Sequence, residues 1–129
     1  IWVADIKKPT RVTCSTFGRK GRGGVEDTAA NLAAAIGGET FEVEEMYPAF
    51  VAVAKLQGEK AAETVLSWAA AAEKVHHGIY LGAGKAVEGG KDLPAKPSHV
   101  CSNCGFTMEG EAPDKCPVCG APRAKFVTF

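Results

Sequence analysis

The chain has 129 residues, which is enough for one or two small domains. Its fifteen basic and fifteen acidic side chains cancel, so no overall positive field favours nucleic acid as a partner. No run of eighteen apolar residues is present and the first residues form no apolar signal segment, so we expect no membrane span.

Residues 1–26 mix basic side chains with glycine, a composition typical of a solvated arm. The run from Gly21 to Gly24 lacks the Gly-Lys-Ser/Thr ending of a phosphate-binding loop. The same segment holds Cys14, which we interpret as an incidental thiol because no histidine lies near it in the sequence.

A helix is expected to begin at Asp27-Thr28, where either residue is a good N-cap before an alanine-rich run. Pro48 should kink this helix without ending it, and Gly58 should end it. Glu39 and Glu42 fall on the face that should be buried, so protons, partners or a metal must neutralise them. The apolar positions of that face are Leu32, Ile36, Met46, Phe50 and Val53.

A second helix is expected from about Glu59 into the region of Gly82 to Gly90. Its apolar face is interrupted by Glu73 and His76, which project from one side because they are three residues apart. A solvated glutamate beside a hydrogen-bonded histidine would also explain this pair. Metal binding is an equal alternative, because helical bundles build two-metal carboxylate sites from Glu-x-x-His on facing helices. We expect His77 on the surface.

Two Cys-x-x-Cys pairs dominate the last thirty residues: Cys101, Cys104, Cys116 and Cys119. Four thiolates suit Zn²⁺ or a single iron ion, and this paired spacing favours a metal over disulfides or an unmetallated cluster. The glycine after each pair can adopt the positive φ that such a turn requires. Cys14 is then left unpaired, which fits the reducing cytoplasm as the location.

The sequence around these cysteines resembles the short rubredoxin-like domain of the rubrerythrin family over roughly residues 99–127. It reads Cys-Ser-Asn-Cys-Gly-Phe, then Glu-Gly and Ala-Pro, then Cys-Pro-Val-Cys-Gly-Ala-Pro, and ends at Phe126. The resemblance implies one iron that cycles between Fe²⁺ and Fe³⁺ without opening a coordination position. We expect Phe106 and Phe126 to form the small core of this domain.

The preceding stretch, about residues 27–88, is similar to the second helix pair of the rubrerythrin bundle. The resemblance implies that Glu39 and Glu42 are iron ligands from the first helix, with Glu73 and His76 from the second. It also implies that Tyr47 hydrogen-bonds near a ligand carboxylate. These five residues are our candidate catalytic set.

The predicted fold is mainly α with a small β module: a ferritin-like helical hairpin followed by a rubredoxin-like domain. We divide the chain into an arm at 1–26, the hairpin at 27–88, a linker at 89–98 and the metal domain at 99–129. A rubrerythrin bundle has four helices in one chain, and residues 1–26 are too short to hold the missing pair. Three explanations remain open: a homodimer that completes the bundle, a truncated product, or a module that keeps only the four-cysteine iron.

The resemblance implies an NADH-linked peroxidase of the cytoplasm that protects against oxidative stress by reducing hydrogen peroxide to water. Electrons would come from an external donor, either rubredoxin or an NAD(P)H-dependent reductase, and pass through the four-cysteine iron to a di-iron site shared between two chains. Zinc is a substitute for iron at the cysteines. Two alternatives are a non-catalytic electron-transfer or structural module, and a ferroxidase that handles iron.

Overall fold

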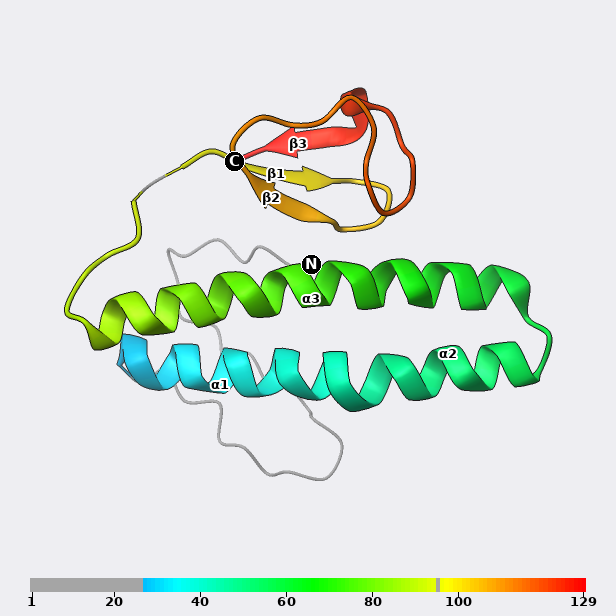
Figure 1. Ribbon diagram of the computed structural model, residues 1–129, viewed down its shortest axis with the longest axis horizontal. Coiled ribbons are helices and arrows are strands. Elements are labelled where there is room, and N and C mark those ends of the chain that lie inside the picture. The colour runs from blue at the N-terminus through cyan, green and yellow to red at the C-terminus, as the bar shows by residue number, and fades with distance from the viewer. Residues whose placement is uncertain (1–26, 95) are drawn as a thin grey trace, which may run out of the picture.

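The computed structural model describes residues 27–94 and 96–129. The predicted basic arm and Cys14 lie outside the described residues. The described part forms a long helical hairpin and a small antiparallel sheet, with the sheet lying over α3 (Figure 1). The expectation of a mainly helical fold with a small four-cysteine β module is confirmed.

The first arm of the hairpin consists of α1 (Thr28–Phe41), the π-helical turn η1 (Glu42–Met46) and α2 (Tyr47–Leu56). Asp27 is the N-cap, as expected, and its Oδ1 accepts a 2.8 Å hydrogen bond from the Ala30 amide. This contact satisfies one of the amides that have no partner within the helix.

The helix continues through Pro48, as expected from the sequence. Just before the proline, its backbone widens into the π turn. The Tyr47 amide donates to the Glu42 carbonyl, five residues back. A proline inside a regular α-helix lacks an amide and crowds the carbonyl four residues earlier. The π turn absorbs this conflict, and π turns are frequent at functional sites.

The second arm is a single helix, α3 (Lys60–Glu88), which runs antiparallel to α1 and α2 (Figure 1). Gly58 has φ +75° and lies in the turn between the arms, where a side chain would strain the backbone. Among the described residues, no helix is long and apolar enough to cross a membrane.

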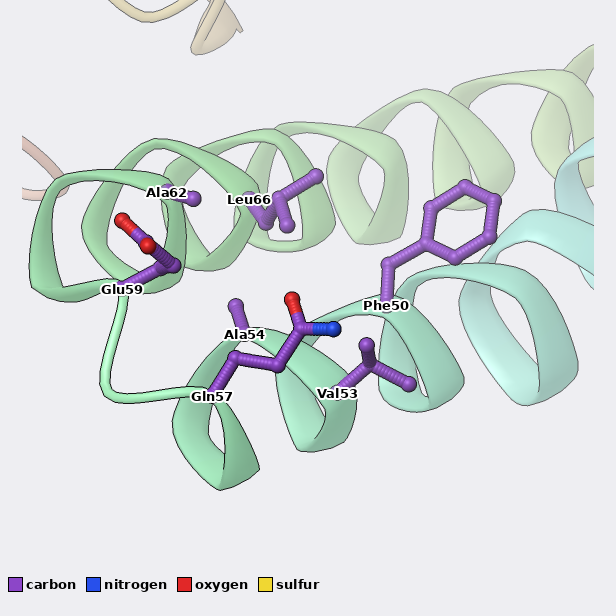
Figure 2. Close-up of a pocket in the computed structure, with 7 residues that line it drawn as sticks. All are labelled: Phe50, Val53, Ala54, Gln57, Glu59, Ala62 and Leu66. Carbon is purple, nitrogen blue, oxygen red and sulfur yellow. The ribbon is translucent and has the colours of Figure 1, made fainter.

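The hairpin buries little of its apolar surface. Ala54 and Ala72 are its buried apolar residues among those described, while Phe50 is 48% exposed and Val53 is 51% exposed. Phe50, Val53 and Leu66 line an open groove between α2 and α3 (Figure 2). Two helices can cover each other along one stripe only, so the apolar side chains predicted on the first helix remain partly exposed to solvent.

The sheet consists of β1 (Ser98–Cys101), β2 (Thr107–Glu109) and β3 (Phe126–Thr128), with β1 in the middle and both neighbours antiparallel to it. A 3₁₀ turn, η2 (Arg123–Lys125), precedes β3. The rings of Phe106 and Phe126 meet edge to face with centroids 6.5 Å apart. Strand β1 begins one residue before the predicted start of the metal domain, and the domain division itself stays a prediction.

Candidate metal centres

The four cysteines of the two Cys-x-x-Cys pairs converge, and their sulfurs all lie within 4.8 Å of one another. The Cys101 and Cys119 sulfurs are 3.7 Å apart, and those of Cys104 and Cys116 are 3.5 Å apart. Sulfurs about 2.3 Å from a central ion in a tetrahedron stand about 3.8 Å from one another. The sulfur spacing therefore fits one tetrahedral ion.

Each cysteine pair is shaped by the glycine that follows it. Gly105 has φ +80° and Gly120 has φ +73°. The Gly105 amide donates to the Cys101 carbonyl and the Gly120 amide donates to the Cys116 carbonyl. These bonds close the two turns so that both sulfurs of a pair face the same point.

The thiols of the cluster differ in how firmly they hold their protons. Burial raises the pKa of Cys104 above its usual range, because a thiolate is poorly solvated there. Burial acts in the same direction on Cys119, but hydrogen bonds from Asn103 and from the Ala121 backbone outweigh it and lower its pKa to about 6. A bound cation would stabilise all four thiolates together.

A second cluster lies between the two arms of the hairpin. Glu39 comes from α1, and Glu73 and His76 come from α3; their ligand atoms lie within 4.8 Å of one another. His76 Nδ1 is 2.7 Å from Glu73 Oε2. Glu39 Oε2 is buried and has no hydrogen-bond partner among the described residues. An unpaired buried carboxylate oxygen is costly, and a cation at this point would satisfy it.

The carboxyl groups and the imidazole of this cluster shift one another's pKa. Burial, together with the neighbouring Glu73, raises the pKa of Glu39 to about 7. The hydrogen bond between Glu73 and His76 lowers the pKa of Glu73 and raises that of His76. Two carboxylates and an imidazole in this arrangement suit iron, and both clusters fit iron sites.

Two predicted site residues lie beside the cluster rather than within it. Glu42 is the first residue of the π turn, and burial, followed by the charge of Glu73, raises its pKa. Burial also raises the pKa of the Tyr47 phenol, with further contributions from the carboxylates of Glu73 and Glu42. Both therefore lie within electrostatic reach of the cluster. Their roles as ligand and as hydrogen-bond donor stay predictions.

The expectation that His77 lies on the surface is wrong. The residue is half-buried, and its Nε2 is 3.1 Å from the Thr40 hydroxyl on α1. Thr40 also donates to the Ile36 carbonyl. Helix α1 packs closely enough against α3 to cover part of His77, the residue next to His76 of the cluster.

Sequence reasoning missed Thr107, whose hydroxyl lies 2.9 Å from His76 Nε2. It belongs to β2, so it reaches the helical cluster only because the sheet lies against α3. Nothing in the local sequence of β2 signals this contact, since it joins residues 31 positions apart.

The raised pKa values predict that the metal-free hairpin loses stability as the pH rises. Folded Glu39 holds its proton to about pH 7, whereas an unfolded glutamate loses it near 4.5, and the pKa of His76 is also raised on folding. The folded chain therefore binds more protons, so stability falls as pH rises through these values. We expect the melting temperature of the helices, without metal at the Glu–His cluster, to fall from pH 6 to pH 8.

Glu39→Gln should flatten this pH dependence, because the amide does not titrate. Glu44→Gln, at an exposed position on the π turn, is the matched control and should keep the wild-type slope. Circular dichroism melts at 222 nm measure both. A melting temperature that rises from pH 6 to pH 8 would contradict the assigned protonation.

Comparison with known proteins gives a consistent result. The family model described as rubrerythrin matches residues 21–83, and the one described as the rubredoxin-like domain of rubrerythrin matches residues 99–127. Rubrerythrin-2 of Clostridium acetobutylicum is 37% identical over 99 residues, which is 77% of this chain and 54% of that protein. Rubrerythrin of Nitratidesulfovibrio vulgaris is 36% identical over 105 residues, which is 79% of this chain and 55% of that protein.

Solved structures of nigerythrin have the same fold. The partially reduced state superposes with a TM-score of 0.72 at 32% identity, covering 82% of this chain and 52% of that one. The fully reduced, all-ferrous state gives 0.70 at 33% identity, covering 81% and 50%. The chain spans about half the length of the curated relatives it matches. On the match of both of its parts, the chain belongs to the rubrerythrin family.

Proposed function

We propose that this chain is a non-haem iron peroxidase that reduces hydrogen peroxide to water. The observation that carries the proposal is the Glu39–Glu73–His76 cluster, with its buried carboxylate oxygen that lacks a partner. In the same chain, Thr107 connects this cluster to the four-cysteine module. The Glu–His cluster, which suits iron, thus lies beside the four-cysteine module, which suits electron transfer.

The reaction consumes one hydrogen peroxide, two electrons and two protons, breaks the oxygen–oxygen bond and forms two waters. Iron at the Glu–His cluster would bind the peroxide as a Lewis acid and supply the electrons. Glu39, Glu73 and His76 would hold it, with Glu42 as a further carboxylate. The proton that Glu39 carries near pH 7 must leave when a cation binds, so its carboxylate then becomes a ligand.

The four-cysteine module would be the entry point for electrons. Its thiolates suit an iron that changes oxidation state while keeping all four ligands. The donor would be an external rubredoxin or an NAD(P)H-dependent reductase, and we expect the protein in the cytoplasm. Zinc at these cysteines would leave the module as a structural unit.

A second copy of the chain would complete the di-iron site. Two-metal sites in helical bundles take ligands from four helices, and the described hairpin provides two. A two-fold axis would bring a second Glu39–Glu73–His76 set to the same centre and cover the open faces of Phe50 and Val53. The chain has no net charge, so long-range repulsion between copies is absent.

This arrangement predicts about two irons per chain, one at the cysteines and a pair shared by two chains. Protein purified without oxygen should also sediment at twice the chain mass of 13.5 kDa. Elemental analysis and sedimentation equilibrium test both numbers. Three irons per chain would contradict the shared site, because each chain would then hold its own pair.

The catalytic proposal is tested by reducing the iron-loaded protein anaerobically and adding hydrogen peroxide. We expect the visible absorption of the ferric four-thiolate centre to return as peroxide is consumed, with two electrons used per peroxide. If the protein stays reduced while peroxide persists, the chain is an electron carrier. If oxygen restores the colour faster than peroxide does, the ferroxidase alternative is favoured.

A further inference from the structure

The contact between the two modules supports an inference about the histidine of the Glu–His cluster. Both ring nitrogens of His76 have partners: Nδ1 lies 2.7 Å from Glu73 Oε2, and Nε2 lies 2.9 Å from the Thr107 hydroxyl. The His76 side chain is only 13% exposed, so water does not substitute freely for either partner. The two contacts fix the plane of the ring.

The direction of the Thr107 hydrogen bond follows from its second partner. The Thr107 hydroxyl donates to the Gly105 carbonyl at 3.0 Å. A hydroxyl has one hydrogen, so its oxygen faces His76 as an acceptor. His76 Nε2 must therefore carry the hydrogen and donate it to Thr107. Nδ1 lies against the Glu73 carboxylate, to which it donates its own hydrogen in this structure. A cation at the cluster would displace that hydrogen, and Nδ1 is then the nitrogen that offers a lone pair.

We propose that Thr107 is a positioning residue for the Glu–His centre, holding His76 with Nε2 protonated and Nδ1 presented to the metal. Histidine ligands are commonly oriented by a partner on the other ring nitrogen, and loss of that partner typically weakens metal binding 10- to 100-fold. Here the partner comes from the module that carries the other metal cluster. This inference rests on the proposed function, since it requires a metal at the Glu–His centre.

The test uses the full chain with one equivalent of Zn²⁺ at the four cysteines, into which Co²⁺ is titrated by calorimetry. Thr107→Val removes the hydroxyl and keeps a β-branched side chain suited to the strand. We expect the Co²⁺ affinity to fall about tenfold, at the low end of the range, because the Gly105 carbonyl also contacts His76. Thr107→Ser, which restores the hydroxyl, should bind Co²⁺ within about threefold of the wild type.

A matched control is available on the same sheet. The Thr128 hydroxyl lies 3.0 Å from His99 Nδ1, on the neighbouring strands β3 and β1. Thr128→Val removes a threonine–histidine contact of the same kind away from the Glu–His cluster. It should leave the Co²⁺ affinity unchanged.

A second measurement needs no variant. In protein with Zn²⁺ at both centres, the ¹⁵N chemical shifts of His76 report which ring nitrogen binds the metal. We expect metal on Nδ1 and a slowly exchanging hydrogen on Nε2, and Thr107→Val should speed that exchange. Metal on Nε2 in the wild type would overturn the inference even if every variant misfolded.

The possible failures are distinguishable. If the wild type binds no Co²⁺ beyond the cysteine site, the proposed function fails and the inference fails with it. If the wild type binds Co²⁺ and Thr107→Val binds it equally well, only the positioning role is overturned. If Thr107→Ser weakens binding as much as Thr107→Val, packing rather than the hydroxyl is responsible, which also overturns the inference.

Discussion

Replacing Glu73 and His76 together with alanine should slow the peroxide-dependent oxidation of the reduced protein by more than about 100-fold. Loss of a partner of a ligand alone typically costs 10- to 100-fold, and this change removes two ligands themselves. Glu39 would be the one member of the Glu39–Glu73–His76 cluster left, and a single carboxylate is too few ligands to hold an iron. Stopped-flow absorbance of the four-thiolate iron measures the rate.

The matched control replaces a glutamate and a histidine outside the cluster. Glu63 pairs with Lys60 near the start of α3, and His99 pairs with Thr128 on the sheet. Glu63→Ala with His99→Ala should oxidise at nearly the wild-type rate. If the Glu73→Ala, His76→Ala protein keeps that rate, peroxide takes electrons directly from the four-cysteine iron and the two-centre mechanism is wrong.

Much of the hairpin could be predicted because its signals are local. Asp27 caps the first helix, Gly58 turns the chain, and Glu39 and Glu73 stand out as charges on faces that should be apolar. A residue's helical face follows from its spacing along the sequence. The convergence of two carboxylates and a histidine could therefore be anticipated before the structure was known.

The features that sequence reasoning missed depend on tertiary contacts. Pro48 does not fit a regular α-helix, and the backbone can adjust to it in several ways. A kink was the adjustment expected, whereas the structure has a π turn before the proline. His77 is half-buried because Thr40 on the opposite arm reaches it. Thr107 meets His76 only because the sheet lies against α3. No periodicity along the chain encodes these distances.

Removing the metal from the four cysteines should unfold the sheet while the helical hairpin survives. The buried apolar residues described in this module are Cys101, Ala112 and Cys116, so two of the three are themselves candidate ligands. Structural metal ions of this kind contribute about 10–16 kcal/mol to folding, which is as large as the whole stability of a typical domain. Without the ion, burial of Ala112 and the contact of the two phenylalanine rings cannot hold three short strands.

Hydrogen exchange can locate this loss. After chelation, the backbone amides of β1, β2 and β3 should exchange freely, while the circular dichroism of the helices changes by less than about a tenth, because helical and sheet residues share few contacts. Cys104→Ser should reproduce the chelated state, whereas Cys14→Ser, outside the two Cys-x-x-Cys pairs, should keep the metal. Protected strands in the metal-free chain would mean that packing alone folds the module. If the strands do unfold, Thr107 leaves His76, and metal binding at the Glu–His centre should weaken by the same factor as in Thr107→Val or more.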